Sequence, residues 1–257
     1  MNKSEENLEF VNVEITYNGK PVLKDLSYTF RKSAVTCILG PSGSGKTTML
    51  RSLSRLNDRI HGFKVSGEVW VAGEEIYFNG VDVYHLRRKV GMIFQSPCIF
   101  PTSVYENVVF GFKYHHPERK KELPDIVEKY LREACLWDEV KDRLKKPAQN
   151  LSQGQKQRLS IARTLAVEPD ILLMDEPTAS LDPVSCEAIE SLIFSLKKKR
   201  SIIMATHNIA QTRRIADEVV FLYDGTIWEQ GEANEFFDRP KKKETRIFLE
   251  SGGSSSS

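Results

Sequence analysis

Residues 40–48 read GPSGSGKTT, a run that combines three glycines with a lysine and two threonines. The spacing is G-x-x-x-x-G-K-T, with an apolar run before it at 34–39 and a helical pattern after it at 47–56. Glycines let the backbone bend until its N–H groups converge on an anion, and the following helix directs its positive end to the same point. The lysine adds a charge for the β- and γ-phosphates of a nucleotide, and the first threonine can bind Mg²⁺. The run therefore predicts a phosphate-binding loop, as opposed to a glycine-rich turn without a ligand, formed by Gly40, Pro41, Ser42, Gly43, Ser44, Gly45, Lys46, Thr47 and Thr48.

A pair of acidic residues, Asp175 and Glu176, ends the apolar run ILLMDE at 171–176. In open α/β sheets, ligands bind at the carboxyl ends of the strands, which is where this pair is expected. One carboxylate there can hold Mg²⁺ directly or through water, and a second beside it can orient and polarise an attacking water. By themselves the two acids fit an ordinary strand-to-turn junction equally well, but the phosphate-binding loop upstream favours a site that hydrolyses a nucleotide.

The apolar runs predict an α/β fold. Three of them are nearly continuous, which is typical of parallel strands buried on both faces, and each precedes a polar or glycine-rich turn and a helical pattern. These strands are expected at 34–39, 171–174 and 202–205, and a fourth at 219–223 ends at Asp224 and Gly225. The N-terminal part differs, because weakly alternating segments at 8–16 and 22–30 surround an Asn18 and Gly19 hairpin turn, and another short strand is expected at 67–73. We expect these strands to be antiparallel and to flank the parallel sheet.

Residues 103–144 are charged and helical in pattern, without a strand of their own. Within 118–136 the apolar residues recur with the period of a helix, at Leu123, Ile126, Val127, Tyr130, Leu131 and Ala134. We therefore expect one domain over 1–250, in which 1–95 and 147–250 form a nucleotide-binding core and 96–146 form a helical subdomain. Residues 251–257, SGGSSSS, are expected to be a flexible tail.

Composition narrows the class of protein. Among the 257 residues, 37 Lys and Arg balance 35 Asp and Glu, so a strongly basic nucleic-acid scaffold is disfavoured. No apolar run approaches the roughly 18 residues of a membrane span, and the start, MNKSEENLEF, lacks the apolar core of a signal peptide. The four cysteines, Cys37, Cys98, Cys135 and Cys186, have no metal-ligand spacing, and Cys37 is expected in the core. A reducing, cytosolic compartment follows as the expectation.

The motif LSQGQ at 151–155 lies between the two candidate regions, and His207 follows them. In this order, GPSGSGKTT, LSQGQ, ILLMDEP and His207 resemble the ATP-binding-cassette ATPases, over roughly residues 8 to 240. The resemblance implies a P-loop NTPase fold with a RecA-like parallel sheet core, an N-terminal antiparallel β subdomain and an inserted helical subdomain. It also implies ATP and Mg²⁺ as ligands, and an active ATPase, since no catalytic residue of the family is visibly replaced.

The resemblance assigns roles to particular residues. Tyr17 is similar to the aromatic residue that stacks on adenine, although a tyrosine that packs locally in a turn is the alternative. Gln95, in MIFQ, is similar to the glutamine that touches Mg²⁺ and the attacking water, so the implied metal ligands are Thr47, Gln95 and Asp175. Glu176 is similar to the general base, or at least to the residue that orients the water, and His207 to the histidine near the γ-phosphate.

Ser152, Gly154 and Gln155 resemble residues of the motif that, in that family, completes the ATP site of another subunit. The physical basis is again a helix start, because a helix over about 152–167 offers N–H groups and a hydroxyl to an anion. Gln153 stands where the family usually has Gly, and a positive φ there would strain Gln. Ser180, Leu181 and Asp182 resemble the loop that crosses the dimer interface, while Asp182 before Pro183 also has the pattern of a helix cap.

Segments at 55–69, 81–111 and 205–217 resemble the ATPase subunits of bacterial phosphate importers. The implied partners are a second copy of the chain, two transmembrane permease subunits and, indirectly, a solute-binding protein, with no nucleic acid, at the cytoplasmic face of the membrane. The alternatives are an importer of another solute, such as an amino acid or other oxyanion, and a soluble ATPase of this family without a transport role. The apolar residues after Gln95 either form a docking groove for the membrane subunits or join the helical subdomain to the sheet: Pro97, Ile99, Phe100, Pro101, Tyr105, Phe110 and Phe112.

Overall fold

A six-stranded sheet forms the centre of the protein in a computed structural model that describes residues 8–252. Its strands run in the order β10-β9-β3-β8-β7-β6, and all neighbours are parallel except β9 and β10. The strands are β3 (Val35–Leu39), β6 (Val90–Ile93), β7 (Ile171–Asp175), β8 (Ser201–Thr206), β9 (Glu218–Tyr223) and β10 (Thr226–Glu232). All four predicted strands of this sheet are present, and every residue of β3 and β7 is buried, as their continuous apolar runs predict.

Sequence analysis missed two strands of this sheet, β6 and β10. The strand β6 contains only four residues, VGMI, and β10 is mostly polar, TIWEQGE, so neither has a pattern that stands out from its surroundings. A tight turn at Asp224 and Gly225, both with positive φ, brings β10 back antiparallel to β9. Each of these two strands is stabilised by pairing with a neighbour, β6 with β7 and β10 with β9, and only the fold shows which strands are neighbours.

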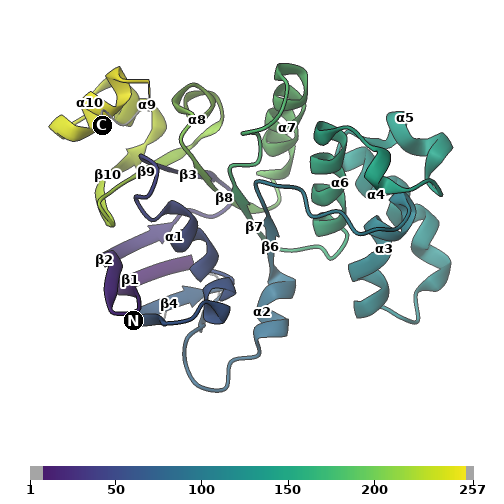
Figure 1. The fold of residues 1–257 in the computed structure, drawn as a ribbon, viewed down its shortest axis with the longest axis horizontal. Coiled ribbons are helices and arrows are strands. Elements are labelled where there is room, and N and C mark those ends of the chain that lie inside the picture. The colour runs from purple at the N-terminus through teal and green to yellow at the C-terminus, as the bar shows by residue number, and fades with distance from the viewer. Residues whose placement is uncertain (1–7, 253–257) are drawn as a thin grey trace.

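The second sheet is antiparallel and lies beside the first, with the order β2-β1-β4-β5 (Figure 1). Its strands are β1 (Leu8–Tyr17), β2 (Lys20–Phe30), β4 (Phe63–Val71) and β5 (Glu74–Glu75). The predicted hairpin turn is confirmed, because Asn18 and Gly19 both have positive φ between β1 and β2. The predicted strand at 67–73 begins earlier and ends earlier, since pairing with β1 starts at Phe63 and a turn at Ala72 and Gly73 stops it.

The helix α1 (Lys46–Ser52) packs between the two sheets, with Met49 and Leu50 fully buried among residues of both. It ends four residues before the predicted limit, because Arg55 adopts a left-handed conformation and begins a short 3-10 helix at Leu56–Arg59. The other helices that cover the central sheet or follow it are α2 (Val83–Lys89), α6 (Gln153–Leu165), α7 (Pro183–Leu196), α8 (Ile209–Ile215), α9 (Ala233–Asp238) and α10 (Lys243–Glu250).

The remaining helices form a group on the side of the central sheet away from the antiparallel strands (Figure 1). They are α3 (Val104–His115), α4 (Leu123–Glu133) and α5 (Trp137–Val140), and α3 and α4 both pack on α6. The six apolar residues that recur with the period of a helix in this part of the sequence are all buried. The division of the chain at 96 and 147 remains our proposal, and these three helices, which extend from Val104 to Val140, lie within it.

The described residues contain no helix that is both long and apolar enough to cross a bilayer. All four cysteines are free thiols, and Cys37 is buried in the core as predicted. Of the predicted tail, residues 253–257 lie outside the described residues, as do residues 1–7.

Candidate active site

The order of the parallel strands brings four predicted segments to one edge of the sheet. The phosphate-binding loop follows β3, His207 follows β8, Asp175 and Glu176 end and follow β7, and Gln95 follows β6. Parallel neighbours all present their carboxyl ends at the same edge. Because β7 lies between β8 and β6, Glu176 is expected between His207 and Gln95, and the side-chain contacts show that it is.

The phosphate-binding loop is closed by its own lysine. The Lys46 ammonium donates hydrogen bonds to the carbonyl oxygens of Gly40, at 2.8 Å, and Pro41, at 2.7 Å. Burial lowers the pKa of Lys46, while the charges of Glu176 and Asp175 oppose that effect. Gly45 has a φ of 102°, and a Cβ there would lie 2.5 Å from the Leu23 side chain, so only glycine fits at this point.

Asp175 is held from two sides by residues of α1. The Thr47 hydroxyl donates to Asp175 Oδ1 at 2.9 Å, and Arg51 Nη2 lies 3.3 Å from Oδ2. Burial raises the pKa of Asp175, although the Thr47 hydrogen bond and the Arg51 charge oppose that effect. Sequence analysis missed Arg51; the available signal was its position one helical turn after Thr47, which places both side chains on the same face of α1.

Glu176 is the point at which three candidate residues meet. Its Oε1 lies 2.9 Å from Nδ1 of His207, and its Oε2 accepts a longer hydrogen bond, 3.4 Å, from the Gln95 amide. The backbone of Glu176 has a φ of 45°, in the left-handed region that non-glycine residues seldom adopt. Its N–H donates to Ala205 O of β8 at 2.9 Å, which holds the residue in this conformation. Strained backbone of this kind occurs preferentially at functional sites.

Two cavities adjoin the loop and share Thr47 and Thr48. The first has a volume of about 400 Å³ and is lined by Val22, Ser42, Gly43, Gly45, Lys46, Thr47, Thr48, Gln95, Asp175 and Glu176. The second has a volume of about 350 Å³ and is lined by Tyr17, Asn18, Thr47, Thr48, Arg51, Asn57, Ile60 and His61. Because both cavities contain Thr47 and Thr48, the cavity at the predicted phosphate site adjoins the cavity that contains Tyr17, the residue predicted to stack on adenine.

Tyr17 lines its cavity and also packs locally, because its ring lies 5.7 Å from that of Phe63. Both interpretations of this residue are therefore compatible with the structure. Asn57, Ile60 and His61 were not predicted, since the short 3-10 helix at Leu56–Arg59 and the loop that follows it have no periodic pattern. That loop is held in place by Asn57, whose amide donates to Thr48 O at 2.9 Å, and by the hydrogen bond from Asn18 N to Gly62 O.

The LSQGQ residues are not part of these cavities. Ser152 caps the N-terminus of α6, and none of Ser152, Gly154 and Gln155 lines either cavity. Gln153 is the first residue of α6 and lacks a positive φ, so glutamine is tolerated there without strain. A Cβ on Gly154 would lie 2.2 Å from Ser185 Oγ, which accounts for glycine at that position.

The loop after Glu176 leads into α7. Asp182 caps this helix by accepting a hydrogen bond from Ser185 N at 3.0 Å, and Pro183 is its first residue. The cap prediction is confirmed. The second interpretation of Ser180, Leu181 and Asp182, as a loop that crosses an interface between two copies, remains a prediction.

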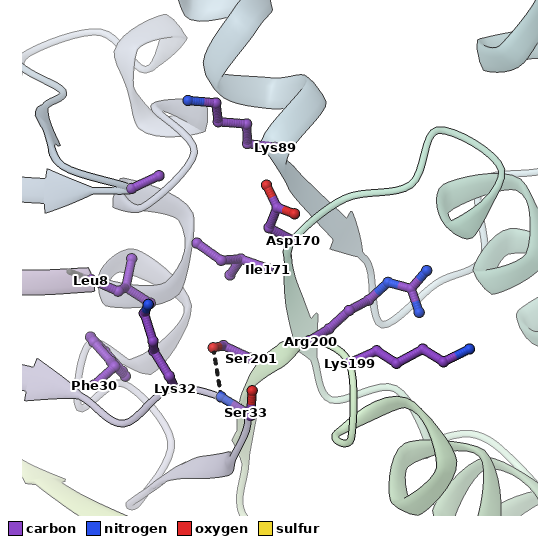
Figure 2. Close-up of a pocket in the computed structure, with 11 residues that line it drawn as sticks. Leu8, Phe30, Lys32, Ser33, Lys89, Asp170, Ile171, Lys199, Arg200 and Ser201 are labelled. Carbon is purple, nitrogen blue, oxygen red and sulfur yellow. Dashed lines mark hydrogen bonds between the residues drawn. The ribbon is translucent and has the colours of Figure 1, made fainter. Parts of the chain in front are cut away.

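Another cavity, of about 360 Å³, lies at the opposite edge of the central sheet, where β7 and β8 begin (Figure 2). Its lining includes Ser201, whose Oγ accepts a hydrogen bond from Ser33 N at 3.1 Å. Figure 2 shows Lys199 and Arg200 pointing away from Lys89, so their charges do not converge on one point. None of the predicted site residues lines this cavity.

Comparisons with known proteins agree with this arrangement. Residues 23–179 match the family model described as ABC transporter. A phosphate import ATP-binding protein, PstB, of Borrelia garinii subsp. bavariensis is 45% identical over 247 residues, covering 96% of this chain and 95% of that protein. The protein of the same name from Thermotoga maritima is 46% identical over 242 residues, covering 94% and 96%.

Solved structures show the same fold. The cbiO1 protein from Clostridium perfringens, described as part of the ABC transporter complex cbiONQ, superposes with a TM-score of 0.79 at 29% identity and covers 96% of both chains. A bacterial Atm1-family ABC exporter with ATP bound has a TM-score of 0.80 at 25% identity, over 98% of this chain and 43% of that one. The predicted fold class is confirmed, and the chain belongs to the ABC transporter family.

Proposed function

We propose that this protein is the ATP-hydrolysing subunit of a membrane importer for inorganic phosphate. The observation that carries the solute assignment is the identity of 45–46%, over nearly the whole length, to phosphate import ATP-binding proteins. An ATPase subunit does not touch the transported solute, so its own residues carry no chemical signature of that solute. The hydrolytic part of the proposal is supported independently by the contacts of Glu176.

Glu176 is suited to receive a proton from, or to orient, the water that attacks the γ-phosphate. A carboxylate can only accept hydrogen bonds, so the 2.9 Å contact with His207 requires a hydrogen on Nδ1. In the neutral ring this leaves Nε2 as an acceptor. The Gln95 amide holds the other carboxylate oxygen, so the carboxylate is oriented from both sides before substrate binds.

The residues near the loop also suit Mg²⁺, which prefers oxygen ligands and usually binds through one or two carboxylates together with substrate phosphates. Thr47 offers a hydroxyl and Asp175 a carboxylate, and Gln95 offers Oε1 because its Nε2 is directed at Glu176. Within residues 8–252 no group of three or more His, Cys, Asp or Glu is placed to hold a metal. Bound there, Mg²⁺ would neutralise charge on the β- and γ-phosphates.

Lys46 and Ser44 would contact the phosphates themselves. The Ser44 hydroxyl is buried and has no hydrogen-bond partner among the described residues, which fits a loop built to receive an anion. The Lys46 ammonium has three hydrogens, two of which are donated to the loop carbonyls. The third is left for phosphate oxygens, and the two carbonyls hold the charge at the centre of the loop.

Arg51→Ala is expected to raise the Mg²⁺ concentration needed for half-maximal ATPase activity by roughly 10- to 100-fold, the range for losing a residue that orients a metal ligand. The physical reason is that Arg51 positions the Asp175 carboxylate and, by its charge, opposes the rise in the pKa of Asp175 that burial causes. The measurement is ATPase rate against Mg²⁺ at saturating ATP. Arg59→Ala, at an exposed arginine in the following turn, is the matched control, and an unchanged Mg²⁺ dependence of Arg51→Ala would contradict the positioning role of Arg51.

Ser152, Gly154 and Gln155 are proposed to complete the ATP site of a second copy of the chain. Support comes from their position at the start of α6, outside the cavities next to the phosphate-binding loop of their own chain. Two copies would then enclose two ATP molecules, and closure of the pair would move the membrane subunits. Hydrolysis would let the pair open again.

The apolar segment after Gln95 divides into two groups, which addresses the alternatives left open by the sequence. Phe112 is buried, and Ile99 and Tyr105 pack against the core, so these residues join the helices to the sheet. Phe110 and Tyr114, one turn apart on α3, are 59% and 75% exposed. We assign this exposed pair to the surface that meets the permease subunits, at the cytoplasmic face of the membrane.

The test of the whole proposal is purification of the native protein from membranes in mild detergent. We expect two multi-span membrane proteins to copurify, and ATPase activity of the reconstituted complex to rise when its solute-binding protein is loaded with phosphate. Stimulation by an amino acid or another oxyanion, and not by phosphate, would show an importer of another solute. Copurification with soluble proteins or nucleic acid alone would exclude a transport role and leave the ATPase chemistry intact.

A further inference from the structure

A short helix outside the active site reaches the LSQGQ motif through one side chain. Glu139, on α5, accepts a hydrogen bond from Gln155 Nε2 at 2.7 Å through Oε2 and from Arg158 Nη1 at 2.6 Å through Oε1. The Arg158 guanidinium is nearly buried and also donates to Cys135 O at 2.6 Å. The Glu139 carboxylate is therefore held between the two α6 residues that it contacts.

Gln155 in turn determines the start of α6. Its Oε1 accepts a hydrogen bond from Ser152 N at 3.0 Å, while its own N–H donates to Ser152 Oγ at 3.3 Å. This reciprocal pair is a capping box, which satisfies two of the N–H groups at the start of a helix. An amide side chain has a donor end and an acceptor end that can exchange places by rotation. A carboxylate accepts only, so Glu139 requires Nε2 on its own side and thereby directs Oε1 toward Ser152 N.

The consequence is that the helix start presents only donors to an anion. Gln155 N and Ser152 N are both occupied within the box, and the N–H groups of Gln153 and Gly154 have no acceptor inside the helix. Because Ser152 Oγ already accepts from Gln155 N, its hydroxyl hydrogen can be donated outward. An amide turned the other way would aim Nε2 at Ser152 N, which would break the box and release the serine rotamer.

We propose that Glu139 is a positioning residue for the LSQGQ motif: through Gln155 it sets the geometry of Ser152, and so the affinity for the γ-phosphate of ATP held by a second copy. This inference rests on the proposed completion of the site between two copies. A carboxylate near a phosphate site would repel the ligand, but Arg158 neutralises it. Burial would raise the pKa of Glu139, yet the hydrogen bonds from Arg158 and Gln155 outweigh that effect and lower it, so the group stays charged at neutral pH.

The adjacent residue supplies a matched control. Asp138 lies on the same four-residue helix and is exposed. Within the described residues its carboxylate forms an ion pair only with Lys141 of the next turn, whose Nζ lies 3.1 Å from Oδ1. Asp138→Ala removes a carboxylate from α5 without touching the LSQGQ motif. Any effect of Glu139→Ala that Asp138→Ala shares is therefore an effect on α5 itself.

The experiment measures ATP-driven dimerisation of the full chain by sedimentation in the Glu176→Gln background. Glu139→Ala is expected to weaken dimerisation at least about tenfold, the loss typical of a hydrogen bond to a charged group. Asp138→Ala should leave it unchanged, and both should bind a fluorescent ADP analogue as the parent does. In the wild-type background, Glu139→Ala should lose ATPase activity at low protein concentration. That activity should return at high protein concentration, because mass action restores the dimer, whereas a variant that is only unstable would not recover.

A second variant tests the route through Gln155. If Glu139 acts by orienting that amide, Glu139→Ala added to Gln155→Ala should cause no further loss of dimerisation. Equal dimerisation of Glu139→Ala and its parent, or full additivity of the two substitutions, would overturn the inference. If the Glu176→Gln parent itself stays monomeric with ATP, the completion of the site between copies is wrong, and this inference is overturned with it.

Discussion

Glu176→Gln is expected to bind ATP normally and to hydrolyse it about 10²–10⁴ times more slowly, the usual range for losing a general base. The glutamine would keep the size of the side chain, and its amide oxygen could still accept a hydrogen bond from His207 or Gln95. It could not take up a proton from the attacking water, and it could no longer accept from both residues at once. The measurement is the single-turnover rate of ATP hydrolysis, with ATP affinity determined separately.

The same variant should accumulate an ATP-bound dimer, because the closed pair forms but does not reopen by hydrolysis. Glu128→Gln, on the exposed face of α4 where the glutamate pairs with Arg132, is the control for the substitution itself and should retain full activity. A Glu176→Gln variant that hydrolyses ATP at the parent rate would exclude the catalytic role. One that remains monomeric at saturating ATP and high protein concentration would exclude closure between two copies.

Lys46→Ala is expected to weaken ATP binding itself, by about 10- to 100-fold, as a charged hydrogen-bond donor is worth roughly 1.5–3 kcal/mol. The ammonium lies buried at the centre of the loop, where burial already lowers its pKa and Glu176 and Asp175 help to keep the charge. Its removal also frees the carbonyls of Gly40 and Pro41. The measurement is direct titration of the variant with ATP, with the thermal midpoint of the ligand-free protein recorded alongside.

The control for Lys46→Ala is Lys198→Ala, which removes an exposed lysine near the end of α7. It should bind and hydrolyse ATP as the parent does. Near-normal ATPase activity of Lys46→Ala at low ATP concentration would contradict the assignment of residues 40–48 as the phosphate-binding loop. Loss of binding accompanied by a collapse of the thermal midpoint would instead indicate that the freed carbonyls destabilise the loop.

Features that depend on a few neighbouring residues could be read from the sequence. The loop at Gly45, the hairpin turn at Asn18, the helix start near Ser152 and the cap at Asp182 all follow from the chemistry of residues within about four positions of one another. Buried strands such as β3 and β7 were found for the same reason, since an unbroken apolar run must be covered on both faces. The order of motifs along the chain then indicated the family.

Features that depend on which strands become neighbours required the tertiary structure. The convergence of Gln95 and His207 on Glu176 follows from the position of β7 between β6 and β8, and no local pattern records that order. Arg51 with Asp175, and Glu139 with Gln155, likewise join segments far apart or on different helices. The sequence by itself determined the chemical groups and the local backbone that displays them. The folded chain decided which of these groups meet, because such contacts arise from the packing of whole sheets and helices.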